Sequence, residues 1–136
     1  MSKGGIWGKF MSVALWCVLF AGLLPILVGG LSKKLGGNYN NNDPRGQAVG
    51  YVGMAKRAHA AHSNSFEAFP LFAVAVLIAE MKGVPRGTVD MLALAFIGLR
   101  LGYVAAYLAD KSVLRSIVWT LGVFVTIAIF TSPTWK

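Results

Sequence analysis

Residues 57–80 read RAHAAHSNSFEAFPLFAVAVLIAE. The second half of this stretch is an apolar run of the kind that lies in lipid. The first half carries five polar or charged side chains: Arg57, His59, His62, Asn64 and Glu67. Such side chains are costly in hydrocarbon unless they pair with one another or line a wet cavity. We therefore predict a transmembrane helix whose first turns face a polar cleft.

The composition of the chain favours a membrane protein. Its 136 residues suffice for a single domain, 1–136. They are 56% hydrophobic and only 13% charged, with a mean hydropathy of +0.62, whereas soluble domains carry roughly 25% charged residues. The net charge of +8 lies mostly between the apolar segments, where it meets lipid head groups. We therefore expect membrane lipid and no nucleic acid among the partners.

Apolar segments and turn signals predict an all-α integral membrane protein, a bundle of four transmembrane helices. We place the helices at about 8–32, 56–81, 87–109 and 113–130, with a polar loop over 33–46. The side that holds this loop and the turn before the last helix carries seven Lys and Arg residues, against five on the other side. The more basic side is usually cytoplasmic, so we expect the long loop in the cytoplasm.

Arg100 lies inside the predicted third helix, where an arginine indicates a functional site. The second and third predicted helices are joined by a tight turn and should be antiparallel neighbours. Glu67 and Arg100 each lie 14 residues from that turn, which puts both roughly 21 Å from it at 1.5 Å per residue. We therefore predict that Glu67 is the partner of Arg100.

Helical spacing gathers further polar residues at this depth. Asn64 shares a face with Glu67, while Tyr103 and Tyr107 share one with Arg100. The fourth predicted helix begins nearby and carries Arg115 and Ser116. Such a cleft suits a small zwitterionic anion, because arginine grips carboxylates in a bidentate manner and a carboxylate holds an ammonium. Glutathione fits this description, as do other ligands of the same kind.

Structural roles compete with these interpretations. Glu67 and Arg100 could form an ion pair that only sets helix register, and Asn64 could be an interhelical hydrogen-bonding residue. Arg57 alone is typical of a head-group anchor. His59 and His62 allow a metal by spacing, but no suitable third ligand is near, so we expect no metal site.

Three stretches resemble the MAPEG family, the membrane-associated proteins in eicosanoid and glutathione metabolism. Residues 57–70 resemble its second-helix pattern of Arg, Ala, Asn-x-x-Glu and Pro. Residues 100–108, RLGYVAAYL, resemble its third-helix pattern, and residues 115–119, RSIVW, resemble the Arg-Ser start of its fourth helix. The order and the loop lengths agree over nearly the whole chain, and the chain looks most like bacterial-type members.

The resemblance implies a homotrimer in a bacterial inner membrane, with active sites between subunits at the cytoplasmic side. It implies glutathione as co-substrate for thiol transfer to lipophilic electrophiles or for reduction of lipid hydroperoxides. The resemblance implies that Asn64, Glu67 and Tyr107 hold the peptide. The polar cleft adds Arg57, Arg100 and Tyr103 as candidate binding residues. Arg115 and Ser116 would be catalytic, beside the sulfur.

The chain also departs from the family pattern of the animal members. Ser63 replaces an arginine before the asparagine, Tyr103 replaces a histidine, and Trp119 replaces an aromatic hydroxyl. No arginine closes the first helix before Leu31. Fewer cations imply weaker glutathione binding, or a different thiol.

Two other functions fit parts of the sequence. A small multidrug transporter would use Glu67 as a proton switch, although a nearby Arg100 would repel cationic drugs. A non-catalytic membrane subunit of a larger complex would need no thiol site, which agrees with the missing basic residues.

Overall fold

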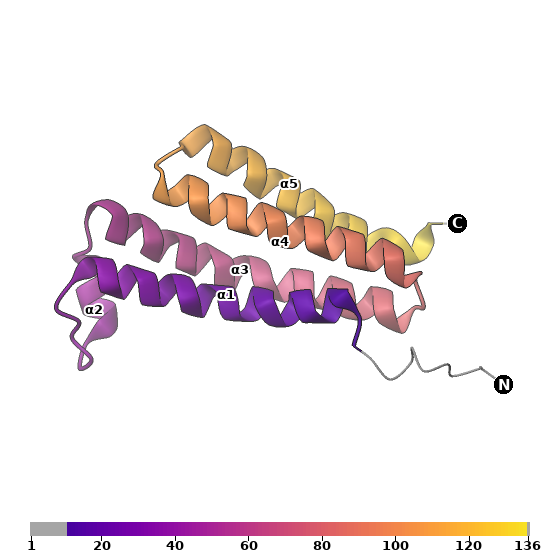
Figure 1. The fold of residues 1–136 in the computed structure, drawn as a ribbon, viewed down its shortest axis with the longest axis horizontal. Helices are drawn as coiled ribbons and strands as arrows, with labels where there is room; N and C mark the ends of the chain where they lie inside the picture. The colour runs from indigo at the N-terminus through magenta and orange to yellow at the C-terminus, as the bar shows by residue number, and fades with distance from the viewer. Residues whose placement is uncertain (1–10, 136) are drawn as a thin grey trace.

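The computed structural model describes residues 11–135 and consists of helices joined by short connections (Figure 1). In chain order the elements are α1 (Val13–Gly36), α2 (Pro44–Val49), α3 (Gly53–Met81), α4 (Arg86–Leu108), α5 (Ser112–Thr131) and a 3-10 turn (Ser132–Thr134). Four of them, α1, α3, α4 and α5, are long and apolar enough to cross a membrane. The predicted four-helix membrane bundle is therefore confirmed.

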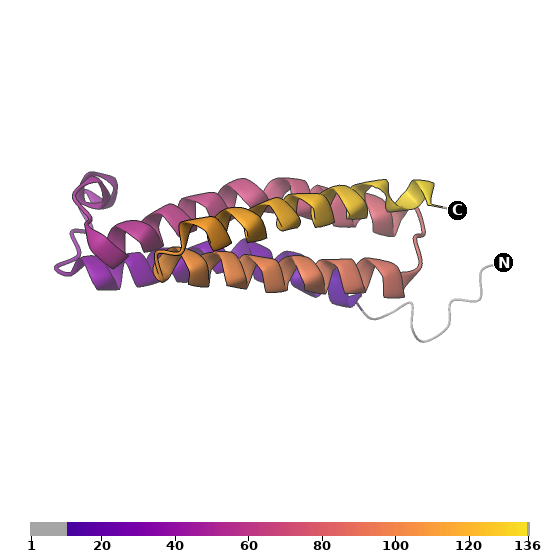
Figure 2. The same cartoon turned by 90° about the horizontal axis from the view of Figure 1, so that it is seen from above.

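The four long helices run side by side along one axis (Figures 1 and 2). α1 packs along α3, α4 packs along α5, and both pairs contact each other. Alanines on α1, α3 and α4 are the commonest residues of the core, and they let the backbones approach closely. The rings of Phe72 and Phe96 stack across α3 and α4 with centroids 3.9 Å apart.

The helix bounds differ from prediction mainly around the polar loop. The first helix continues to Gly36 rather than stopping at 32, and positions 8–10 of its predicted start lie outside the described residues. The predicted loop over 33–46 instead begins at Gly37, and part of it forms α2. Asp43 caps α2 by accepting a hydrogen bond from the Gly46 amide at 2.9 Å, and Pro44 starts it, which is a favourable first position.

The remaining bounds lie close to prediction. α3 begins at Gly53 rather than at 56, whereas α4 and α5 differ from prediction by one residue at each end. α1 begins and α5 ends at one end of the bundle, while α2 lies at the other end, which we call the loop end (Figure 1).

The outer surface of the bundle is apolar. Large hydrophobic side chains on α1 and α5 stay exposed, among them Leu19, Leu23, Leu27, Phe124 and Phe130. Of the helices long enough to cross a membrane, α5 buries the smallest share of its apolar stretch, 17%. This surface suits contact with lipid or with a neighbouring membrane helix.

Candidate functional site

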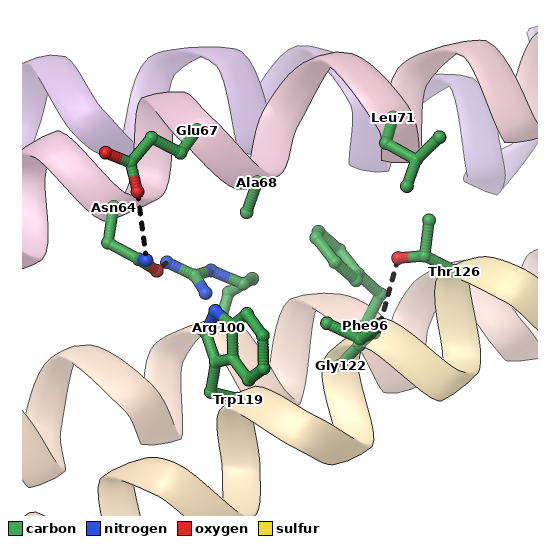
Figure 3. A pocket seen from close by; sticks show the side chains of 10 residues that line it. Asn64, Glu67, Ala68, Leu71, Phe96, Arg100, Trp119, Gly122 and Thr126 are labelled. Carbon is green, nitrogen blue, oxygen red and sulfur yellow. Dashed lines mark hydrogen bonds between the residues drawn. The ribbon is translucent and has the colours of Figure 1, made fainter.

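A cavity of about 230 Å³ lies between α3, α4 and α5 (Figure 3). Its polar lining consists of Asn64, Glu67, Arg100 and Thr126, with the indole of Trp119 beside Arg100. The rest of its wall is apolar or small: Ala68, Leu71, Phe96, Gly122 and Val123. The cavity therefore joins a charged region to an apolar region, and we call it the central cavity.

Arg100 is the buried cation of this site, only 4% exposed. Its guanidinium donates to Asn64 Oδ1 at 3.0 Å and to Ser65 Oγ at 3.2 Å. The Ser65 hydroxyl donates its own proton to the Ala61 carbonyl oxygen at 2.8 Å, which leaves an oxygen lone pair for Arg100. The α3 helix thus supplies two neutral acceptors to one buried charge.

Glu67 is not the direct partner of Arg100, so that part of the prediction is wrong. Its carboxylate lies on the exposed side of α3 and accepts from Asn64 Nδ2 at 3.3 Å. Asn64 therefore joins the cation to the carboxylate, with its oxygen toward Arg100 and its amide nitrogen toward Glu67 (Figure 3). Both residues line the central cavity, but the depth estimate could not set the rotation of α3 about its axis.

A row of aromatic and basic side chains continues from Arg100 toward the loop end. The Arg100 guanidinium carbon lies 4.4 Å from the centroid of the Tyr103 ring, and that ring meets Tyr107 edge-on at 5.6 Å. The Arg115 guanidinium carbon lies 4.3 Å from the Tyr107 centroid. Distances of this kind are typical of cation–π contacts. Arg100, Tyr103 and Tyr107 follow i, i+3, i+7 spacing on α4, and their row ends at Arg115 of α5.

Of the predicted site residues, only Asn64, Glu67 and Arg100 line this cavity. Five do not: Arg57, Tyr103, Tyr107, Arg115 and Ser116. Arg57 donates from Nε to the Leu108 carbonyl oxygen at 3.3 Å, a contact that closes the last turn of α4. Ser116 is exposed on another face of α5, where it lines a shallow hollow with Ser112 and Thr120. Within one chain the structure thus separates Ser116 from Asn64, Glu67 and Arg100.

Several lining residues were not predicted from the sequence. Ser65 is adjacent to Asn64 and gave no separate signal, because serine is common on helices that pack closely. Trp119, Gly122 and Thr126 follow i, i+3, i+7 on α5, so helical spacing from Trp119 could have found the other two.

The histidines of α3 have a structural environment. His62 Nδ1 lies 2.6 Å from the Pro25 carbonyl oxygen of α1, and the ring of His59 lies 5.6 Å from that of His62. Among residues 11–135 no group of three His, Cys, Asp or Glu side chains could hold a metal ion.

The charges of the central cavity suit a ligand that carries both a carboxylate and an ammonium group. Arg100 offers charged donors, and the exposed Glu67 carboxylate offers an acceptor about one helical turn away from Asn64. The apolar wall beyond them is open to an alkyl or aromatic group.

A comparison with family models matches the MAPEG family over residues 13–135, nearly the whole chain. The chain belongs to the MAPEG family. This confirms the resemblance carried by residues 57–70, 100–108 and 115–119, and it agrees with the four membrane-spanning helices. No protein with a curated description and no solved structure matches this MAPEG chain. As a MAPEG protein with four apolar helices, it is an integral membrane protein.

Proposed function

We propose that this MAPEG protein uses glutathione to conjugate lipophilic electrophiles or to reduce lipid hydroperoxides. The observation that carries the proposal is the chain of contacts from Arg100 through Asn64 to Glu67, which borders an apolar cavity inside a membrane bundle. Separate charges of both signs match a zwitterionic peptide, while the apolar wall matches a substrate that arrives from the bilayer.

The peptide would bind along the polar residues of α3 and α4. Arg100 would hold a carboxylate, and Asn64 and Glu67 would hold the amine and an amide. Tyr103 and Tyr107 would orient the peptide between the two arginines, because each ring contacts one guanidinium. Arg57, which contacts the end of α4, would support this region from outside.

Arg115 is the residue that we assign to the thiol. A guanidinium beside the sulfur stabilises the thiolate and lowers the pKa of a thiol from about 8.5. In conjugation the sulfur attacks an electrophilic carbon and the leaving group departs. In peroxide reduction the sulfur attacks the distal oxygen and an alcohol leaves with a proton. A second glutathione then attacks the resulting sulfenic acid, which yields a disulfide and water.

Ser116 would donate a hydrogen bond to the thiolate only if the sulfur lay at the other face of α5. The Arg115→Ala and Ser116→Ala variants separate the two arrangements. If only the first variant loses thiolate, the sulfur lies beside the Tyr107 ring; if both lose it, the sulfur lies within reach of both side chains.

The complete site would be formed in a homotrimer. Ligand pockets usually measure about 300–1,000 Å³, and the central cavity of one chain measures about 230 Å³. A neighbouring subunit would supply the remaining wall. The loop end would lie in the cytoplasm, on the seven-to-five bias of Lys and Arg. A bacterial inner membrane is the location that the resemblance to bacterial-type members suggests.

The first test is calorimetric titration of glutathione into the detergent-purified protein. We expect binding by the parent protein, at least about tenfold weaker binding after Glu67→Gln, and loss of ultraviolet thiolate absorbance after Arg115→Ala. Lys111→Gln is the matched control, since it removes an exposed cation one turn before Arg115, whereas Arg115 is the cation that contacts the Tyr107 ring. A panel of electrophiles and hydroperoxides then separates the two reactions.

Absence of binding at millimolar glutathione would contradict the proposal. It would favour another thiol or a non-catalytic subunit. Co-purification of a partner at fixed stoichiometry would then support the second role.

A further inference from the structure

A second and larger cavity lies on the other side of α3, between α1, α2 and α3 at the loop end. It measures about 800 Å³ and shares no lining residue with the central cavity. Its lining includes Lys33, Arg45, His59 and His62, and none of the described residues that line it is acidic. We call it the loop-end cavity. Its formal charges are all positive.

Two rings that line the loop-end cavity, those of His62 and Tyr51, pack on glycines of α1. A Cβ atom at Gly29 would lie 2.8 Å from His62 Nδ1, and one at Gly36 would overlap the Tyr51 ring. Both rings therefore pack directly on the α1 backbone. The His59 ring lies between them, 6.1 Å from Tyr51 and 5.6 Å from His62. The cavity is thus a packed feature of three elements, not a gap beside a loose loop.

Lys33 and Arg45, the two permanent cations of this cavity, form no ion pair with a described residue. Lys33 Nζ donates to the Tyr39 hydroxyl at 3.0 Å, a neutral contact, and lies 4.5 Å from the centroid of that ring. The Arg45 side chain is exposed and makes no hydrogen bond or ion pair with any residue in 11–135. Asp43 is the nearest acidic residue in sequence, and its carboxylate is occupied by the Gly46 amide. Lys33 and Arg45 therefore have no acidic partner among residues 11–135, which leaves both charges available to an anionic ligand.

The cavity also crosses from apolar to polar surface. Ile26, 60% exposed on the apolar outer side of α1, lines one part of it, and Lys33 lines another. They lie seven positions apart on α1, which is roughly 10 Å along the axis. A free inorganic anion would use only the polar part. An amphiphile would use both, with its charge at Lys33 and Arg45 and its chain beside Ile26.

We infer that the loop-end cavity binds the phosphate ester head group of an anionic phospholipid from the leaflet at the loop end. Arginine and lysine are the usual partners of phosphate, and basic pockets between transmembrane helices at the membrane edge suit lipid head groups. The site does not depend on the proposed thiol chemistry, because it is lined by different residues on the other side of α3.

Native mass spectrometry of the full chain in detergent tests this inference, with phosphatidylglycerol and phosphatidylcholine as probes. We expect phosphatidylglycerol to bind at least about tenfold more tightly than phosphatidylcholine. The double variant Lys33→Gln/Arg45→Gln should remove that preference, because it removes both charge-assisted contacts. The double variant Lys34→Gln/Lys56→Gln is the matched control, since it removes two exposed cations of α1 and α3 outside the cavity. It should keep the preference within about twofold.

Three results would overturn the inference. If both double variants lost the preference for phosphatidylglycerol equally, the lipid would be attracted to the basic surface in general and not to this cavity. Displacement of the lipid by millimolar inorganic phosphate would identify a free anion as the ligand. Displacement by glutathione would make the loop-end cavity part of the thiol site. Circular dichroism of each variant confirms that the helices are retained.

Discussion

Gly29 sets how closely α1 and α3 approach at the loop end. The His62 ring lies over its backbone, and His62 Nδ1 reaches the Pro25 carbonyl oxygen one turn earlier. Gly30, the next residue, faces open space, since a methyl group added there would meet no described atom within 4 Å. The two adjacent glycines therefore have different roles, because only one of them lies at a helix contact.

We predict that Gly29→Ala destabilises the protein whereas Gly30→Ala does not. The added methyl of Gly29→Ala must displace the His62 ring, and such overpacking costs about 1–3 kcal/mol. Thermal unfolding in detergent, followed by circular dichroism, measures both variants. Equal midpoints for the two variants would show that His62 is not packed on Gly29.

Asn64 is the second residue with a decisive role, since it joins Arg100 to Glu67. Its amide can accept from the guanidinium and donate to the carboxylate at once, which neither leucine nor aspartate can do. Arg100 keeps one further acceptor, Ser65.

We predict that Asn64→Leu lowers the free energy of unfolding by about 1–3 kcal/mol, because it removes an acceptor from a buried charge. Glu67→Gln should change it by less than about 0.5 kcal/mol, because Glu67 is exposed and does not contact Arg100 directly. Unfolding in a denaturing detergent series measures the difference. A larger loss of unfolding free energy for Glu67→Gln would indicate that Glu67 pairs directly with Arg100.

At the scale of the elements, the polar loop between α1 and α2 is held by hydrogen bonds to one side chain, Gln47 of α2. The Gln47 Oε1 atom accepts from the Asn40 amide at 2.7 Å, and its Nε2 donates to the Gly37 and Asn38 carbonyl oxygens at 3.1 and 2.9 Å. These three contacts occupy backbone groups between α1 and α2. They position the loop beside the loop-end cavity.

We predict that Gln47→Ala speeds hydrogen exchange and proteolysis of residues 37–43 without changing the four long helices. Local opening of an exposed segment costs far less than global unfolding. Gln47→Glu should give an intermediate result, because glutamate keeps the acceptor for Asn40 and loses both donors. Identical exchange in the parent and Gln47→Ala would show that Gln47 does not hold the loop.

The bundle taken as one body leaves a broad apolar surface on α1 and α5. Lipid can cover this surface, and so can another subunit. The small size of the central cavity favours a neighbour, since a single chain does not enclose a whole peptide.

We predict a homotrimer in mild detergent, with a protein mass three times the 14.5 kDa of the chain. Light scattering coupled to size-exclusion chromatography, corrected for bound detergent, measures it. Phe124→Ala, on the exposed face of α5, and Phe72→Ala, in the core, form a matched pair. The first should weaken assembly and the second should weaken folding. A monomeric mass for the parent would contradict the trimer.

Residue order alone was enough to predict that this chain crosses a membrane with four helices, and it located their turns to within a few residues. The reason is local: a backbone in lipid must satisfy its own hydrogen bonds, so apolar length and turn residues decide where helices begin and end. The same reasoning predicted that Glu67 and Arg100 lie near each other, and both line the central cavity. The family pattern could also be recognised from the sequence, because it consists of short local motifs in residues 57–70, 100–108 and 115–119.

Which side chains meet was settled by the packing of the helices against one another. Arg100 pairs with Asn64 and Ser65 rather than with Glu67, and Ser116 lies outside the central cavity. These outcomes depend on how each helix is rotated about its axis. That rotation is set by close contacts between helices, such as the His62 ring against Gly29, which residue spacing along one helix does not encode.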